Sequence, residues 1–102
     1  MDPMVRSFFL GFIKIHILHH AAAEPVYGLW LIDELKRHGY DISPGTLYPI
    51  LHSLEEDGML RSHERVANGK VRKYYRTTPK GNNALKEAKI KVRELLRETI
   101  EE

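Results

Sequence analysis

The chain has 102 residues, enough for one domain, with 42% hydrophobic residues, 29% charged residues and a formal net charge of +2. It has no cysteine, which excludes disulfides, thiol nucleophiles and zinc sites that need sulfur. Lysine and histidine interrupt the N-terminal apolar run, which is also too short to span a bilayer, so we expect a cytoplasmic protein without a signal peptide or a membrane segment.

The first predicted element is a helix over about residues 4–22, with apolar side chains on nearly all its sides. Such a helix must be covered on more than one side. A chain of this length buries only about two-thirds of its unfolded surface, so it gains from association. We therefore expect a partner subunit to cover part of this helix.

Two shorter helices are predicted next, over residues 26–38 and from Ser43 to about residue 56, with a break at Glu24-Pro25 before the first of them. Gly39 suits the end of the first helix, and Ser43 with Pro44 suits the start of the second. The apolar residues of the second helix recur at i, i+3, i+4 and i+7, which is typical of an amphipathic helix. Two helices joined by a short turn predict a helix-turn-helix unit.

A β-hairpin is predicted from residues 60–66 and 71–77, which flank Asn68-Gly69. A two-residue turn pairs Arg65 with Arg72, and strand alternation then places the arginines together with His63 and Tyr74 on one face. The opposite face, with Leu60, Val66, Val71 and Tyr75, is expected to cover the core. Like charges opposite each other destabilise a hairpin, and phosphates would relieve the repulsion. Residues 61–80 carry seven basic side chains and one acidic one, which indicates a surface for a polyanion.

The last predicted element is a helix that Thr78 and Pro79 begin and that runs nearly to the C-terminus. Its apolar residues follow a heptad spacing, which predicts a dimer seam. They are Leu85, Ala88, Val92, Leu95 and Thr99, with Leu96 and Ile100 beside them.

This order of elements predicts an α+β, mostly α, fold: a winged helix-turn-helix with N- and C-terminal dimerisation helices. Residues 1–80 would form the winged-helix DNA-binding domain, and residues 81–102 the C-terminal dimerisation helix of the same compact unit. The recognition helix would enter the major groove of DNA. With Leu47, Ile50, Leu51 and Leu54 inward, its outward residues are Gly45, Thr46, Tyr48, Pro49, His52 and Ser53.

Two motifs carry a family resemblance: Gly-Thr-Leu-Tyr-Pro at residues 45–49 and Tyr-Tyr-Arg-Thr-Thr-Pro-Lys-Gly at residues 74–81. With them, the sequence resembles the PadR family of transcriptional regulators over about residues 8–96, although Leu29 and Trp30 depart from the family pattern. The resemblance implies a homodimer that represses transcription by binding an operator, which for a two-fold dimer should be palindromic. It implies DNA contacts from Ser43, Gly45, Thr46, Tyr48, Pro49, Lys70, Arg72 and Lys73, and the residue pattern adds His52 and Arg65.

The sequence also bears on functions other than DNA binding. A winged helix can serve as a protein-interaction module, and the aromatic residues near the expected dimer interface suit an apolar or aromatic effector. No phosphate loop, cysteine nucleophile or catalytic triad is present, so we expect no enzyme and no cofactor. His16 and His20, with His19 between them, could share a metal, but two ligands on one helix do not close a site. The sequence therefore predicts no metal site.

Overall fold

Four helices and a three-stranded antiparallel sheet make up residues 1–101, the part of the chain that the computed structural model describes. The order along the chain is α1, Pro3–Ala23; β1, Val26–Tyr27; α2, Gly28–Arg37; α3, Pro44–Glu56; β2, Leu60–Ala67; β3, Lys70–Thr77; and α4, Pro79–Thr99. This is the predicted winged helix-turn-helix, with one additional strand.

The helix ends fall close to the predicted signals. Gly39 (φ +89°) and Gly58 (φ +75°) adopt the left-handed conformation just after α2 and α3, and the amide two residues past each C-cap bonds the carbonyl three residues before that cap. This Schellman geometry favours glycine because a side chain there would be strained. At the start of α4, the Thr78 hydroxyl accepts a hydrogen bond from the Gly81 amide at 3.0 Å.

The hairpin register is the one the sequence predicted. β2 and β3 pair Arg65 with Arg72 and Leu60 with Thr77, and the turn residues Asn68 and Gly69 have φ values of +54° and +76°. Both central residues of a type I′ turn need positive φ, which explains the Asn-Gly pair.

The additional strand β1 was not predicted. We expected residues 26 and 27 to open the second helix, but they pair with Tyr75 and Tyr74 of β3, so that the sheet order is β1-β3-β2. Pro25 has no amide hydrogen, and Val26 and Tyr27 both favour extended backbone. Val26 is buried in the core, which holds the short strand against the sheet.

The core lies where α1, α2 and α3 meet the base of the sheet. Its six fully buried large side chains come in pairs from the three helices: Ile13 and Ile17, Leu31 and Leu35, and Leu47 and Leu51. Leu60, Tyr75 and Leu85 cover it from the hairpin and from the first half of α4.

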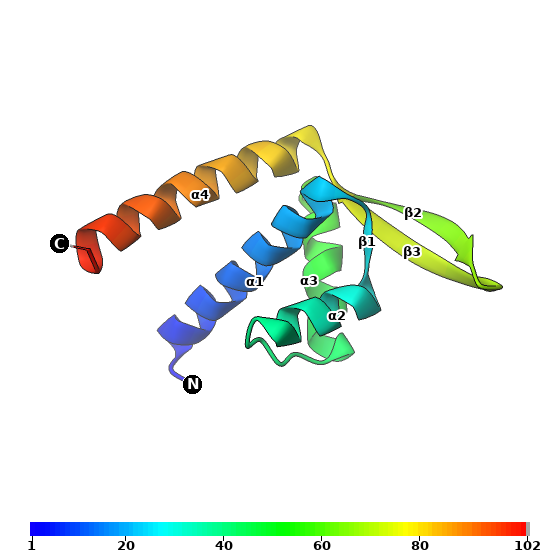
Figure 1. The fold of residues 1–102 in the computed structure, drawn as a ribbon, viewed down its shortest axis with the longest axis horizontal. Helices are drawn as coiled ribbons and strands as arrows, with labels where there is room; N and C mark the ends of the chain where they lie inside the picture. Colours follow the sequence, from blue (N-terminus) through cyan, green and yellow to red (C-terminus); the bar gives the residue numbers. More distant parts are fainter. Residues whose placement is uncertain (102) are drawn as a thin grey trace.

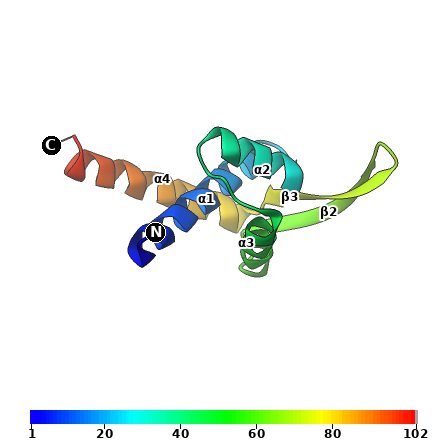
Figure 2. The same ribbon diagram turned by 90° about the horizontal axis from the view of Figure 1, so that it is seen from below.

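The hairpin extends well beyond this core. It projects on one side of the molecule, whereas the N-terminal end of α1 and the C-terminal half of α4 lie on the other (Figure 1), and the view from below shows the same separation (Figure 2). Val66 and Val71, expected to cover the core, are therefore 71% and 64% exposed, and that expectation was wrong. The two strands have eight residues each and extend past the edge of the core. Their side chains near the turn therefore have no core beneath them, even on the face that points toward it.

Candidate nucleic-acid interface

The helix α3, predicted to be the recognition helix, presents a small and polar surface at its first turns. Ser43 is the N-cap, but its hydroxyl donates to Thr46 Oγ1 at 3.4 Å and makes no bond to the backbone of the helix. Gly45 is exposed, and a Cβ atom added there would meet only Ser43 Oγ, at 3.6 Å. A DNA backbone can therefore approach the first turn of α3 closely, at the helix end whose dipole favours phosphate.

Pro49 lies inside α3, on its exposed side. Because proline has no amide hydrogen, the Gly45 carbonyl lacks its usual intrahelical donor. That carbonyl remains available to a donor outside the helix. One turn on, His52 is exposed, and its Nε2 lies 3.0 Å from Glu56 Oε1, a surface contact that water screens.

The Tyr48 side chain packs against the first residue of α2. Its ring lies against Gly28, the first residue of α2, where an added Cβ atom would lie 2.6 Å from Tyr48 Cζ and 2.9 Å from Cε1. The absence of a side chain at Gly28 thus makes room for the ring, and Tyr48 remains 44% exposed. The Tyr48 ring is therefore fixed by Gly28 on one side and exposed to solvent on the other.

The outer face of the hairpin stacks its arginines on tyrosine rings. The Arg65 guanidinium lies 4.1 Å from the centre of the Tyr74 ring, and that of Arg72 lies 4.5 Å from the centre of the Tyr27 ring. The two tyrosine rings meet edge to face at 5.4 Å, and His63 stacks on Tyr74 at 5.9 Å. Cation–π contacts of this kind are favourable, so part of the repulsion between the paired arginines is offset within the protein. The repulsion between Arg65 and Arg72 therefore indicates a phosphate partner less strongly than it did from the sequence.

Lys73 lies on the other face of the hairpin, toward α3. Its Nζ is 3.6 Å from Glu55 Oε1, and the Ser62 hydroxyl donates to the other oxygen of the same carboxylate. The hydrogen bond from Ser62 is the main reason why the pKa of Glu55 lies below its ordinary value. Burial raises the pKa of the neighbouring Tyr75 hydroxyl. These contacts join the base of the hairpin to the end of α3.

A hollow of about 300 Å³ brings α3 and the hairpin together. It follows the edge of β3 that β1 leaves free, because β1 pairs only with Tyr74 and Tyr75. Its lining consists of Tyr48 from α3, Tyr27 from β1, Gly28 and Leu29 from the start of α2, and Lys70, Val71, Arg72 and Lys73 from the hairpin.

The hollow unites some of the predicted DNA contacts and leaves others outside. It gathers Tyr48, Lys70, Arg72 and Lys73, whereas Arg65 lies on the outer strand and does not line it. Ser43, Gly45, Thr46, Pro49 and His52 all lie on α3 outside its lining.

Sequence reasoning missed the part that Tyr27 plays in this hollow, because residue 27 was assigned to a helix. The signal available was Pro25 followed by two residues that favour strands.

No helix within residues 1–101 combines the length and the apolar character needed to cross a membrane.

The fold agrees with the comparisons to known proteins. The PadR-like family of transcriptional regulators matches residues 17–87. The transcriptional regulator Rv3488 of Mycobacterium tuberculosis is 52% identical over 96 residues, covering 94% of this chain and 90% of that protein.

Two crystal structures are similar over most of the chain. A PadR family transcriptional regulator from Eggerthella lenta is 37% identical with a TM-score of 0.79, covering 90% of this chain and 81% of that one. A PadR-like transcription factor from Bacteroides fragilis is 32% identical with a TM-score of 0.82, covering 98% and 97%. PadR-like regulators bind DNA and are not enzymes. The chain belongs to the PadR-like family of transcriptional regulators.

Proposed function

We propose that the protein is a homodimeric repressor that occupies a palindromic operator in the cytoplasm. In this proposal α3 lies in the major groove and reads bases, while the hairpin contacts the DNA backbone. The family resemblance supports the repressor function and the operator, and the exposed apolar side chains of the two long helices support the dimer.

The observation that carries the proposal is the hollow between α3 and the hairpin. Three cationic side chains, Lys70, Arg72 and Lys73, line it on one side, and the exposed edge of Tyr48 lines it on the other. A phosphate held by the hairpin would therefore lie beside the recognition helix. Phosphate contacts fix the position of a protein on DNA, and base contacts specify the sequence.

The exposed side of α3 supplies donors and acceptors for base edges. The half-buried Thr46 and the exposed His52 offer polar atoms, and Tyr48 offers a hydroxyl and an apolar ring that suits a thymine methyl. A protein-interaction module would instead need an exposed apolar patch on this helix. Tyr48 is the one exposed large hydrophobic residue on α3, which favours DNA as the partner.

A second copy of the chain is the proposed cover for the two long helices. From residue 89 to residue 101 every residue is exposed, as are residues 1–8. Large apolar side chains recur on both segments, and exposed apolar surface of this extent indicates an interaction site. A two-fold dimer buries the same patch on both subunits. These side chains are Met4, Val5 and Phe8 on α1, and Ile90, Val92, Leu95, Leu96 and Ile100 on α4 and just beyond it.

A salt titration of DNA affinity tests the function of the hairpin. Binding that neutralises phosphates releases counterions, so the logarithm of affinity should fall linearly with the logarithm of salt. Arg72→Ala should reduce this slope by about one unit and weaken binding to all sequences alike. Lys70→Ala should do the same, whereas Lys86→Ala, which removes the same charge from α4, should leave the slope unchanged. Equal slopes for Lys70→Ala and Lys86→Ala would contradict the proposal.

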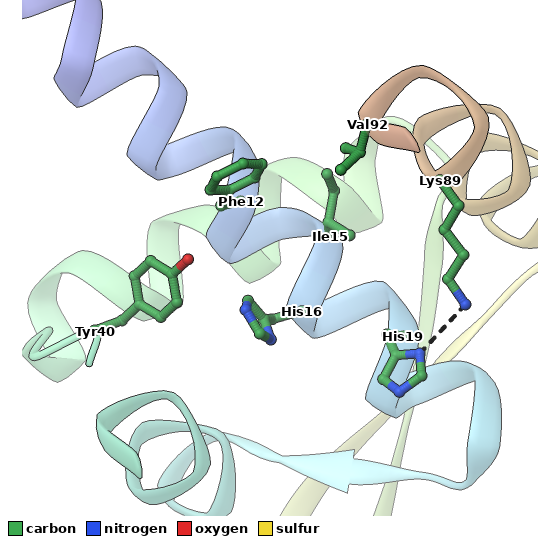
Figure 3. Close-up of a pocket in the computed structure, with 7 residues that line it drawn as sticks. All are labelled: Phe12, Ile15, His16, His19, Tyr40, Lys89 and Val92. Carbon is green, nitrogen blue, oxygen red and sulfur yellow. Dashed lines mark hydrogen bonds between the residues drawn. The ribbon is translucent and has the colours of Figure 1, made fainter. Parts of the chain in front are cut away.

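A second cavity supports an effector site for an apolar or aromatic molecule. It has a volume of about 350 Å³ and lies between α1, α4 and the loop after α2 (Figure 3). Phe12, Ile15 and Val92 supply apolar lining, and His16, His19, Tyr40 and Lys89 supply polar groups. Lys89 Nζ lies 3.4 Å from His19 Nδ1 at one end of the cavity.

A negatively charged aromatic dye, anilinonaphthalene sulfonate, is a suitable probe for this cavity. Its ring matches the apolar lining, and its sulfonate matches Lys89. Lys89→Ala should weaken dye binding several-fold, whereas Lys91→Ala, two positions further along α4, outside the cavity lining and paired with Glu94, should not. Release of operator DNA by the dye would support an effector site, and dye binding that both variants weaken equally would contradict it.

A further inference from the structure

Three histidines from two helices meet beside the core. His16 and His20 lie one turn apart on α1, and His38 follows the last residue of α2. One ring nitrogen of each lies within 4.8 Å of the other two. The rings of His16 and His38 are stacked with their centres 5.0 Å apart. His38 is separated by 18 positions from His20, so the sequence alone showed only a pair on one helix.

A carboxylate stands beside these rings. Glu34 Oε1 lies 3.1 Å from His38 Nε2 and 3.9 Å from His20 Nε2, and the Glu34 side chain is only 12% exposed. Its other oxygen accepts a hydrogen bond from Arg37 at 3.1 Å. A carboxylate that holds a ligating imidazole is the usual second layer of a histidine metal site.

Helix electrostatics account for only part of this arrangement. A positive charge is favourable near a helix C-terminus, which explains His20 and His38 at the ends of α1 and α2. The effect fades within the last turn, and His16 lies beyond it. Burial lowers the pKa of His16 and of His20, so both rings are more often neutral, which is the form that binds metal.

We propose that His16, His20 and His38 bind one divalent transition-metal ion such as Zn²⁺, with the Glu34 carboxylate as fourth ligand or as the group that holds His38. Zinc–nitrogen bonds of about 2.0–2.1 Å at tetrahedral angles place ligand nitrogens about 3.4 Å apart. The three nitrogens therefore need to approach by at most about 1.4 Å, a distance that side-chain rotation covers. Nitrogen ligands favour zinc, nickel or copper over calcium and magnesium.

Such an ion would fix α2 to α1. The two ligands on α1 and the one at the end of α2 belong to different helices, and α2 is the first helix of the helix-turn-helix unit. His16 also lines the cavity next to α4. The site therefore lies between the DNA-reading part of the chain and the helices proposed to form the dimer.

The single tryptophan of the chain provides a direct readout. The Trp30 ring meets the His20 ring edge to face at 5.3 Å. Titration of Zn²⁺ alone into the full chain, prepared without a histidine tag, should change Trp30 emission and saturate at one ion per chain. Ca²⁺ should have no effect. The absence of saturable Zn²⁺ binding at micromolar concentration, or an equal response to both ions, would overturn the proposal.

Substitutions then locate the site. His20→Ala and His38→Ala should each weaken Zn²⁺ binding at least tenfold, and Glu34→Gln about 10–100-fold. His38 is exposed at a helix end, so its variant should keep the fold, which circular dichroism checks. His19→Ala is the matched control, because His19 shares α1 but lies outside the cluster. If His19→Ala weakens binding as much as His38→Ala does, the ion binds elsewhere and the assignment fails.

Discussion

The contact between Gly28 and Tyr48 makes a quantitative prediction about α2 and α3. In Gly28→Ala the new methyl group would overlap the Tyr48 ring, 2.6 Å from Cζ. Overpacking typically costs about 1–3 kcal/mol. Gly28 is in a helix and has no positive φ, so alanine itself would otherwise stabilise the chain by about 0.5–1 kcal/mol. We expect a net loss of about 1–2 kcal/mol in the free energy of unfolding.

Urea denaturation at fixed protein concentration measures this loss, because the stability of a dimer depends on concentration. In the Tyr48→Ala background the overlap is gone, so Gly28→Ala should be neutral or stabilising, with a coupling energy of about 1–3 kcal/mol. Gly45→Ala is the control, since its added Cβ meets only Ser43 Oγ at 3.6 Å and should not destabilise. A Gly28→Ala penalty that persists in the double variant would refute the argument.

Three further predictions concern the dimer, the start of α4 and pH. Leu95→Glu should yield a monomer in sedimentation, because an unpaired charge in the proposed seam costs several kcal/mol, and a wild-type monomer at micromolar concentration would contradict the seam. Thr78→Ala should cost about 1 kcal/mol in thermal unfolding by removing the N-cap of α4, and a loss no larger than that of Thr99→Ala would contradict the cap. Burial lowers the pKa of His16 and of His20 below the value in the unfolded chain. The stability of the metal-free protein should therefore fall as pH drops below about 6.5. This fall should be smaller when both histidines are replaced by asparagine.

Local signals predicted most of the fold. The Asn68-Gly69 turn fixed the hairpin register, and Gly39, Gly58 and Thr78 marked helix ends, because each acts through backbone geometry within a few residues. The predictions that failed concern residues whose conformation or burial depends on contacts with segments distant in the sequence. Val26 forms a strand because β3 lies beside it, and Val66 is exposed because the core ends before the hairpin does.

In the candidate sites too, features within one element could be predicted from the sequence, and contacts between elements could not. The outward face of α3 follows from helix periodicity, so its polar residues could be assigned from the sequence. The stacking of Arg72 on Tyr27 and the pairing of Lys73 with Glu55 join separate elements. Likewise, no spacing rule relates His38 to His16, since the two meet only when α2 packs beside α1.

In the proposed mode of binding, α3 reads the DNA sequence while the hairpin supplies affinity. After selection of a bound sequence from random DNA, fluorescence anisotropy can give the ratio of specific to random affinity for the wild type and three variants. Thr46→Ala and Tyr48→Ala should lower this ratio, with losses of about 1–3 kcal/mol for each reading contact removed. Arg72→Ala should weaken both affinities and leave the ratio unchanged. A ratio that Arg72→Ala lowers while both α3 variants retain the wild-type value would contradict the account.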